Sequence, residues 1–397
     1  MKKLIIVLLA TAFLISCNKL IDFFPKDHIN PFNKIYGGSN WDMFTSVVKP
    51  QHSNFYFASG FTESNDGDIT GNHGGRDIWV VKLNESGNKI WSKAYGGSNE
   101  DYAYASVGSL DGGLIIVGYS SSSDGDLIDN KGSSDSWIIK LDKDGKIEWQ
   151  KNLGGIGQDG AFDIAMTITG DYIIGGFVYS PAENNHQAFI LKMDKGGNII
   201  WQKEFGGSEF ENIYTVKIDY DGGILFAGHS FSKNGAFSEN KGLDDAWLVK
   251  LDKNGNKVWQ ALLGGSQNDE AYSIVPTRDF GYLVSGATWS SDGDVINTTG
   301  DTWIFKLNNK GELKWQKRFN ISAGQSSKLY NSPDGNFILS PGLNFILKLD
   351  NKGNELWRKN VVAGNVEALI PRLDGTFIAA GAIPINQNVD GFVLTVQ

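Results

Sequence analysis

The stretch Trp247-Leu-Val-Lys-Leu-Asp-Lys-Asn-Gly-Asn-Lys-Val-Trp259 predicts two short strands joined by a tight turn. The first strand is rich in aromatic and β-branched residues, which favour strands, and the second carries another tryptophan. Between them, Asp252-Lys-Asn-Gly255 places a glycine where a short hairpin turn needs a positive φ. A single hairpin is only marginally stable in water, so this one must belong to a larger sheet.

Both strands of this hairpin recur along the chain, seven times each. Successive first strands are separated by 58, 52, 58, 56, 42 and 47 residues. Self-similarity at a period of this length is typical of stacked or radially arranged repeat units. The first strands begin at Trp79, Trp137, Phe189, Trp247, Trp303, Phe345 and Phe392, and the second strands at Phe32, Trp91, Trp149, Trp201, Trp259, Trp315 and Trp357.

Two further strands complete each unit. After a Gly-Gly-Ser loop comes a segment rich in small residues, as in Asp101-Tyr-Ala-Tyr-Ala-Ser-Val107. An Asp-Gly-Gly turn and then an apolar strand follow, as in Leu114-Ile-Ile-Val-Gly118. We call the four strands a to d in chain order, so the repeated hairpin is strands c and d. Seven four-stranded antiparallel units predict an all-β fold, a seven-bladed β-propeller over residues 31–397.

The copies of the hairpin are offset at the two ends of the repeat array. The second strand near Phe32 has no first strand before it, and the first strand at Phe392–Val396 has no second strand after it. Together these two strands complete one hairpin. The sequence therefore predicts a ring that closes by pairing the N-terminal strand with the C-terminal blade, which removes the exposed edges of an open array.

The order of the strands divides the loops between two faces. The a–b and c–d connections are tight turns on one face, and the d–a and b–c loops lie on the other. The b–c loops of blades one, two, four and five are long, at residues 62–78, 120–136, 230–246 and 288–302. Longer loops carry function more often than tight turns do. We therefore expect a partner to bind the d–a/b–c face, entering from its low side at blades six and seven.

Two groups of residues are expected in the interior of the propeller. Strand a contains alanine, serine and glycine, which fit the crowded lining of a central channel. Strands c and d hold ten of the twelve tryptophans, which should pack between blades.

Acidic residues recur in the long b–c loops. Three loops contain Asp-Gly-Asp, and an aspartate stands two residues before the aromatic anchor of strand c in most blades. Such carboxylates can hold Ca²⁺, although the spacing matches an EF-hand loop poorly. Alternatively, the Asp-Gly pairs make turns and the carboxylates accept backbone N–H groups. The candidate ligand or calcium residues are Asp66, Asp68, Asp124, Asp126, Asp135, Asp292, Asp294 and Asp301.

The first residues predict export from the cytoplasm. Met1-Lys-Lys is basic, residues 4–15 are apolar, and the segment is too short to span a bilayer. Its ending, Leu14-Ile-Ser-Cys17, resembles the lipobox of bacterial lipoproteins. The resemblance implies a signal peptide at residues 1–16, acylation of Cys17 with palmitate-type chains, and a lipidated tether at residues 17–30. It also implies an outer-membrane location, because Asn18 rather than an aspartate follows the cysteine. The side of that membrane stays open, and a soluble secreted protein with a chance cysteine is the alternative.

The hairpin turn itself resembles known propeller repeats. The order of aspartate, glycine and tryptophan in Asp142-Lys-Asp-Gly-Lys-Ile-Glu-Trp149 is similar to the quinoprotein-like repeat and to the Asp-box of sialidase-type propellers. In both families this motif is structural, so the resemblance implies the fold and no active site. Residues 32–397 as a whole look like the repeat lipoproteins of Bacteroidetes-type bacteria. Blades six and seven depart from that pattern because they lack the Gly-Gly-Ser and Asp-Gly-Asp loops.

Composition and motifs exclude several classes of function. A net charge of −9 excludes the basic footprint that nucleic-acid binding needs. The five histidines have no metal-ligand spacing, and no Gly-x-Ser-x-Gly elbow occurs. We therefore predict no catalytic residues and no cofactor other than the calcium alternative, although a glycosidase-type carboxylate pair stays open. The expected function is a lipid-anchored, non-catalytic envelope module that binds a protein or a glycan. An outer-membrane assembly scaffold and a propeller enzyme acting on extracellular glycans are the alternatives.

Overall fold

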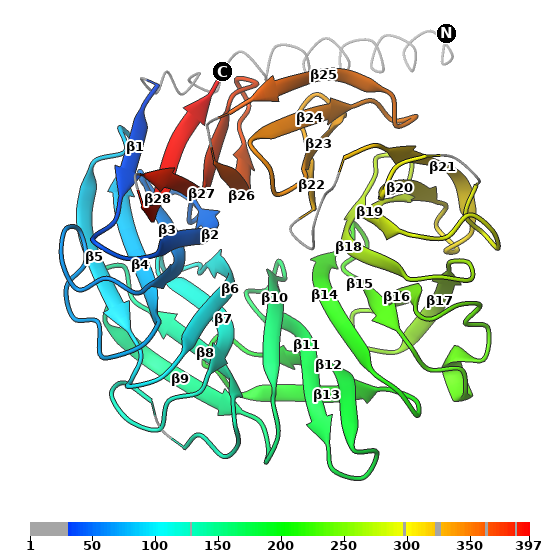
Figure 1. Cartoon of the computed structure of the whole chain (residues 1–397), viewed down its shortest axis with the longest axis horizontal. Coiled ribbons are helices and arrows are strands. Elements are labelled where there is room, and N and C mark those ends of the chain that lie inside the picture. Colours follow the sequence, from blue (N-terminus) through cyan, green and yellow to red (C-terminus); the bar gives the residue numbers. More distant parts are fainter. Residues whose placement is uncertain (1–30, 128, 297–298, 322–326, 362–363, 386) are drawn as a thin grey trace, which may run out of the picture.

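The computed structural model describes residues 31–397 except 128, 297–298, 322–326, 362–363 and 386. These residues form seven four-stranded antiparallel sheets that are arranged radially around a central axis (Figure 1). The predicted seven-bladed β-propeller is confirmed. The predicted signal peptide, Cys17 and the tether lie outside the described residues. In the part of the chain that is described, no helix is long and apolar enough to cross a membrane.

The first six blades each consist of four consecutive strands, and strands that follow one another in the chain are neighbours in the sheet. Blades one to three are β2 (Asp42–Val48), β3 (Phe55–Thr62), β4 (Asp77–Asn84) and β5 (Lys89–Tyr95); β6 (Asp101–Gly108), β7 (Leu114–Ser120), β8 (Asp135–Leu141) and β9 (Ile147–Leu153); β10 (Gly160–Met166), β11 (Tyr172–Ser180), β12 (Asn185–Met193) and β13 (Ile199–Phe205). Blades four to six are β14 (Glu211–Ile218), β15 (Ile224–Ser230), β16 (Asp245–Leu251) and β17 (Lys257–Leu263); β18 (Asp269–Pro276), β19 (Tyr282–Thr288), β20 (Thr302–Leu307) and β21 (Leu313–Phe319); β22 (Lys328–Asn331), β23 (Phe337–Ser340), β24 (Phe345–Leu349) and β25 (Glu355–Asn360). A short 3-10 helix, η2 (Gly235–Phe237), lies in the b–c loop of blade four.

Blade seven joins the two ends of the array. It contains β26 (Asn365–Pro371), β27 (Phe377–Ile385), β28 (Asn388–Val396) and, as its outer strand, β1 (Asn33–Tyr36). The β1–β28 pairing is antiparallel, from Asn33 opposite Leu394 to Tyr36 opposite Gly391. The predicted closure of the ring by the offset hairpin strands is therefore confirmed.

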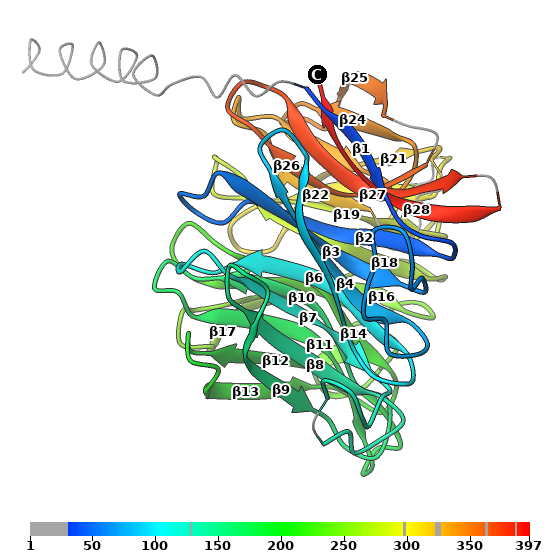
Figure 2. The ribbon, with the colours of Figure 1, turned by 90° about the vertical axis from the view of Figure 1, so that its left-hand side faces the viewer.

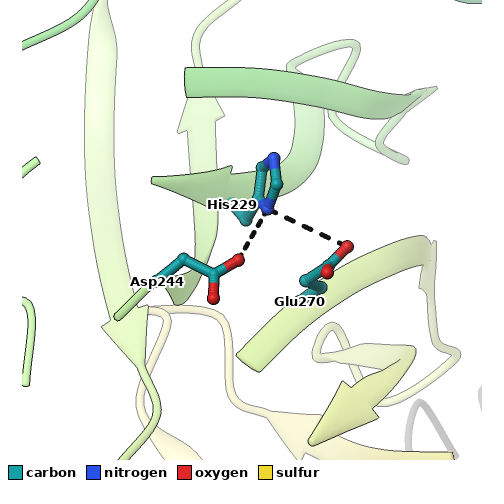
Figure 3. Close-up of side chains that lie close together, drawn as sticks. All are labelled: His229, Asp244 and Glu270. Carbon is teal, nitrogen blue, oxygen red and sulfur yellow. Dashed lines mark hydrogen bonds and ion pairs between the residues drawn. The ribbon is translucent and has the colours of Figure 1, made fainter. Parts of the chain in front are cut away.

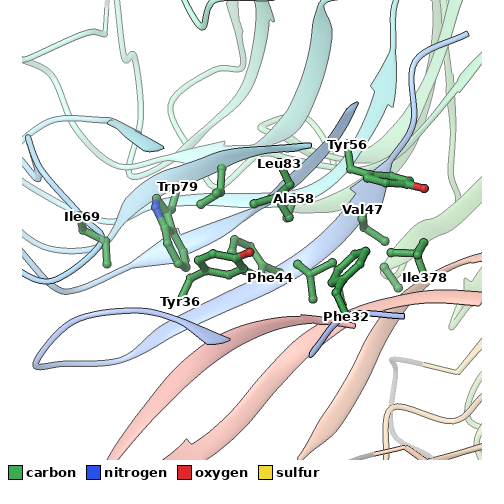
Figure 4. Close-up of a cluster of buried hydrophobic side chains, with 14 residues drawn as sticks. Phe32, Tyr36, Phe44, Val47, Tyr56, Ala58, Ile69, Trp79, Leu83 and Ile378 are labelled. Carbon is green, nitrogen blue, oxygen red and sulfur yellow. The ribbon is translucent and has the colours of Figure 1, made fainter. Parts of the chain in front are cut away.

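The hydrophobic core is divided into layers between adjacent blades. The strand-c tryptophans Trp79, Trp137, Trp247 and Trp303 are completely buried. In the layer that joins blades one and seven, Trp79 stacks on Phe44 with ring centroids 4.5 Å apart, and Phe32 and Ile378 belong to the same cluster (Figure 4). The sheets pack face to face because each buries one apolar surface against the next blade.

In blades one to five, the strand-d tryptophans pack against the following blade. They are half-buried and lie against the glycine of the next blade's c–d turn. A Cβ atom on that glycine would come within 2.5–2.9 Å of the indole, and the glycine has a φ of +72° to +83°. Glycine is therefore required both by the turn and by the close approach. The pairs are Trp91 with Gly145, Trp149 with Gly197, Trp201 with Gly255, Trp259 with Gly311, and Trp315 with Gly353.

The two faces of the ring differ in their connections. Seen from the side, the strands run between the two faces (Figure 2). Strand a lies innermost in each blade (Figure 1). The a–b and c–d turns are short on one face, whereas the b–c loops of blades one, two, four and five are long on the other. Blade six is the smallest blade, because β22 and β23 have four residues each.

Candidate functional site

The Asp-Gly-Asp loops hold the Gly-Gly-Ser loop that lies beside each of them. The first aspartate accepts a hydrogen bond of 2.7 Å from the backbone N–H of the serine in that loop. In blade four, where the motif is absent, the Asn234 side chain accepts the same bond from Ser208 at 3.0 Å. The aspartate pairs are Asp66 with Ser39, Asp124 with Ser98, and Asp292 with Ser266.

The second aspartate of each loop faces the same neighbour. The carboxylates of Asp68, Asp126 and Asp294 accept a glycine N–H of the Gly-Gly-Ser loop at 3.2–3.3 Å. Asp68 also forms an ion pair with Lys89, and Asp294 forms one with Lys241. These contacts agree with the alternative in which the loop carboxylates accept backbone N–H groups. Calcium binding by the same loops stays a prediction.

The remaining two candidates lie in different environments. Asp135 is completely buried, and one of its carboxylate oxygens accepts the N–H of Lys131 at 3.0 Å. Its other oxygen has no hydrogen-bond partner among the residues that the structure describes, and it lies next to Gly154, where the carboxylate of Asp159 approaches from the next blade. Asp301 is exposed just before β20. The structure therefore does not gather the eight predicted residues into one site but distributes them around one face.

The arrangement of Asp135 and Asp159 recurs between other blades. A carboxylate near the start of strand c faces a carboxylate near the start of the next strand a, as with Asp77 and Asp101 across Gly96. Burial raises the pKa of Asp101 to about 6, although the hydroxyls of Ser120 and Ser122 and a backbone N–H stabilise its anion; the charge of Asp77 adds to the rise. These carboxylate pairs lie where neighbouring blades meet at the d–a/b–c face. Asp245 and Asp269 form another such pair across Gly264. Asp390 and Asp42 form a further one, in which burial and then the charge of Asp42 raise the pKa of Asp390.

Strand a carries a β-bulge in every blade except blade six. A bulge inserts an extra residue and redirects its side chain, here next to the propeller axis. Three of these extra residues, Phe162, Tyr214 and Tyr272, line a cavity on the axis. The full set of extra residues is Thr45, Tyr104, Phe162, Tyr214, Tyr272 and Glu367.

The redirected aromatic side chains form a continuous row, which we call the aromatic arc. Tyr104 contacts Phe162 with ring centroids 4.5 Å apart, Phe162 contacts Tyr214 at 5.8 Å, and Tyr214 contacts Tyr272 at 5.5 Å. Seven of these nine residues are half-buried, whereas Phe61 and Tyr272 are buried. The arc crosses blades one to five, the blades that the long loops surround. Its members are Phe61, Tyr102, Tyr104, Tyr119, Phe162, Phe177, Phe210, Tyr214 and Tyr272.

Charged side chains lie at one end of the arc. Arg76, in the b–c loop of blade one, places its guanidinium 4.4 Å from the centroid of the Phe61 ring. It also forms ion pairs with Glu63 at 2.6 Å and with Glu100 at 3.4 Å. A cation held between two carboxylates and over an aromatic face keeps its orientation. This end of the arc therefore offers fixed hydrogen-bonding groups beside apolar rings.

The cavity on the axis has a volume of about 220 Å³ and is lined by strand a of all seven blades. Asp163 accepts hydrogen bonds there from Thr215 at 3.0 Å and from Lys217 at 2.7 Å. From blade six, Lys328 donates to the carbonyl oxygen of Thr45 in blade one at 3.3 Å, and burial lowers the pKa of this lysine. The predicted small residues do line the axis, but aromatic and charged side chains, which were not predicted there, line it as well.

The aromatic arc was missed at the sequence level, although a signal for it exists. In four blades an aromatic residue stands three positions after the acidic residue of strand a. The pattern is visible in Asp101 and Tyr104, and again in Asp269 and Tyr272. Spacing alone does not show that these side chains face the axis, because that direction depends on the bulge.

Comparison with known proteins supports the fold and does not assign a family. No family model matches the chain. The regulatory protein FlaEY of Caulobacter vibrioides is 23% identical over 137 residues, which make up 33% of this chain and 14% of that protein. The WD40 β-propeller domain of Doa1 is similar over 92% of this chain and 97% of its own, with a TM-score of 0.53 and 10% identity. BamB from Moraxella catarrhalis covers 91% of this chain and 85% of its own, with a TM-score of 0.46 and 16% identity. At such identity, the likeness to the Doa1 domain shows the propeller fold alone.

Proposed function

We propose that this propeller is a non-catalytic binding module of the cell envelope, anchored through lipidated Cys17, and that it binds a protein or a glycan at the aromatic arc. The observation that supports the binding role is the arc itself, a row of half-buried rings at the channel end on the long-loop face. The proposed anchor, and with it an outer-membrane location, depends on the lipobox-like ending at Cys17.

The chemistry of the arc suits ligands with flat apolar faces and polar edges. Tyrosine and phenylalanine rings offer large contact areas and have few rotatable bonds to immobilise on binding. The faces of sugar rings and the side chains of an extended protein segment both fit such a surface. Arg76 and its two glutamates add charged groups at one end, which would orient the ligand.

The heights of the loops suggest the direction from which the partner approaches. The b–c loops of blades one, two, four and five surround the arc, whereas blade six connects β23 to β24 through residues 341–344 only. A partner that enters over blade six meets the lowest rim. Shortening the loop at residues 120–136 should then weaken binding, and unchanged binding would contradict this direction of approach.

The binding role can be tested with two matched tyrosine substitutions on opposite faces. Tyr104→Ala removes a central ring of the arc, while Tyr220→Ala removes a ring that is 58% exposed in an a–b turn of the other face. Partners are first recovered by cross-linking in whole envelopes and by glycan-array binding, which separate a protein from a glycan. We expect Tyr104→Ala to weaken Kd about 30-fold, or about 2 kcal/mol, as for a central interface residue. Equal binding by both variants and the parent protein would refute the site.

The two alternative functions give different results in the same experiments. Recovery of a stable membrane-protein assembly would favour an outer-membrane assembly scaffold over a ligand-binding module. Hydrolysis of an extracellular glycan that is abolished by one carboxylate substitution would contradict the non-catalytic role.

A further inference from the structure

A buried group of three metal-binding residue types lies at the boundary of blades four and five. His229 is at the end of β15, Asp244 directly precedes β16, and Glu270 is the second residue of β18 (Figure 3). His229 Nδ1 lies 2.8 Å from Asp244 Oδ2 and 3.8 Å from Glu270 Oε2. One ligand atom from each residue lies within 4.8 Å of the other two, and all three residues are buried.

Within the described part of the chain, several polar atoms in and beside this group have no hydrogen-bond partner. His229 Nε2 and Asp244 Oδ1 are both buried and unpaired, in residues that are 5% and 0% exposed. Asn212 lies directly opposite His229 in the β14–β15 register, and its buried side-chain oxygen is also unpaired. Buried polar atoms are nearly always satisfied in proteins, so the unpaired oxygens of Asp244 and Asn212 indicate a missing partner. His229 Nε2 lies on the far side of the ring from Nδ1, the nitrogen that faces both carboxylates.

The charges of the group are also unbalanced. Among the described residues, no lysine or arginine forms an ion pair with Asp244 or Glu270, and both carboxylates contact one imidazole. Phe210, Tyr214 and Phe231 surround that imidazole with ring centroids 5.2–5.7 Å away, which limits the access of water. Buried carboxylates are costly unless they are paired or bind a cation.

The internal repeat shows that this combination is specific to one blade boundary. The three corresponding positions are Phe61, Arg76 and Tyr102 at the boundary of blades one and two. They are Tyr119, Ser134 and Gly160 at the next boundary, and Phe177, His186 and Asn212 at the one after. The propeller framework is therefore built there without this histidine and these two carboxylates, so their joint presence is not required by the fold.

We propose that His229, Asp244 and Glu270 bind one divalent transition-metal ion, with the side-chain oxygen of Asn212 as an additional ligand. One imidazole nitrogen and carboxylate oxygens are donors suited to Zn²⁺ and related ions. Two carboxylates and one neutral imidazole carry a charge of −2, which a divalent ion neutralises. Tyr214 donates to Glu270 Oε2 at 3.3 Å and would orient this ligand from the second coordination sphere. The site lies beside the aromatic arc, and it does not depend on the proposed partner.

The proposal is tested by metal content and binding in the full chain, purified through a tag that contains no histidine. The chelator-treated protein is mixed with Zn²⁺, desalted and analysed for bound metal, and its affinity is measured by competition with a chromogenic chelator. We expect one Zn²⁺ per chain, and affinity at least about 100-fold weaker in His229→Gln and Glu270→Gln. His73→Gln is the matched control, because His73 Nδ1 also contacts one aspartate, Asp77, at 2.7 Å. It should bind Zn²⁺ like the parent protein.

Two results would overturn the proposal. One is the absence of stoichiometric Zn²⁺ binding by the parent protein, and the other is binding by the His229 and Glu270 variants that equals that of the parent. A variant that fails to fold does not stop the test, because Co²⁺ added to the parent protein reports on the same site. Visible d–d absorption bands of a Co²⁺ site with nitrogen and oxygen ligands, removed by excess Zn²⁺, would support the proposal. A spectrum of aqueous Co²⁺ would refute it.

Discussion

Asp101→Asn should stabilise the propeller at neutral and alkaline pH and have little effect in acid. Asp101 is completely buried at the start of β6 and faces Asp77 across Gly96. An asparagine keeps the geometry, because its oxygen can accept from the Gly97 N–H at 2.7 Å and from the Ser122 hydroxyl at 2.9 Å. Its amide can donate to the Ser120 hydroxyl oxygen, which now donates to the carboxylate. The substitution therefore removes a buried charge and keeps the contacts that the side-chain oxygen accepts, while the Ser120 hydroxyl changes from donor to acceptor.

The magnitude follows from the raised pKa. The folded protein holds the Asp101 proton with a pKa of about 6, against 3.8 for an unperturbed aspartate. The stability that this carboxyl contributes is full below pH 3.8 and is lost as the pH rises through about 6. The difference between the folded and the unperturbed pKa is converted at about 1.36 kcal/mol per pKa unit. It sets an upper limit of about 3 kcal/mol on the free energy of unfolding that Asp101→Asn gains at pH 8. At pH 4 the gain should be close to zero.

The assay is the free energy of unfolding in guanidinium chloride, measured for both proteins at whole pH values from 4 to 8. We expect the variant to gain stability over the parent progressively between pH 4 and pH 7. Asp142→Asn is the control of opposite sign, because the backbone N–H groups of Lys146 and Asp144 lower the pKa of this half-buried carboxylate at a c–d turn. It should lose stability above its pKa and not in acid. A gain for Asp101→Asn that does not change with pH, or a loss at pH 8, would refute this reasoning.

Further substitutions test three other parts of the structure. Trp79→Ala, at a completely buried indole between blades one and seven, should cost about 3–5 kcal/mol in the free energy of unfolding. Gly125→Ala should lower the free energy of unfolding by at least about 2 kcal/mol, because φ is +68° and a Cβ would lie 2.2 Å from the Gly96 oxygen. Gly375→Ala is its control and should lower it by only about 1 kcal/mol, because φ is +82° but a Cβ would meet no atom within 4 Å. The double variant Asp124→Ala/Asp126→Ala should lower the melting temperature equally with and without Ca²⁺ if these carboxylates only hold backbone groups. Calcium-dependent stabilisation of the parent protein alone would assign Ca²⁺ to this loop.

The ring and its closure could be predicted from the sequence because the repeat encodes both. Each blade repeats the same strand-c and strand-d anchors, and the unmatched strands near Phe32 and Phe392 specify how the ends meet. Such local patterns are strong because every blade must bury the same apolar surfaces against its neighbours. The face with the long loops followed directly from strand order.

The aromatic arc and the buried metal-binding residues could not be predicted in the same way. The direction of the Tyr104 side chain depends on a bulge in the β6–β7 pairing, which the alternation of residues in one strand does not reveal. His229, Asp244 and Glu270 come from three strands or loops of two blades, so no sequence spacing unites them. Contacts between blades depend on tertiary structure, and a linear motif search does not find them.

The pairing of β1 with β28 also has a consequence for how the chain folds. Phe32 and Thr395 are 363 positions apart, yet they lie side by side in the finished sheet. At a synthesis rate of roughly 5–20 residues per second, β1 waits for about 20–70 s before its partner strand exists. During that time β1 is an unpaired strand with free backbone hydrogen-bonding groups, which makes it prone to pairing with other chains. Blade seven is therefore the last sheet to assemble, and the nascent chain needs protection until β28 has been made.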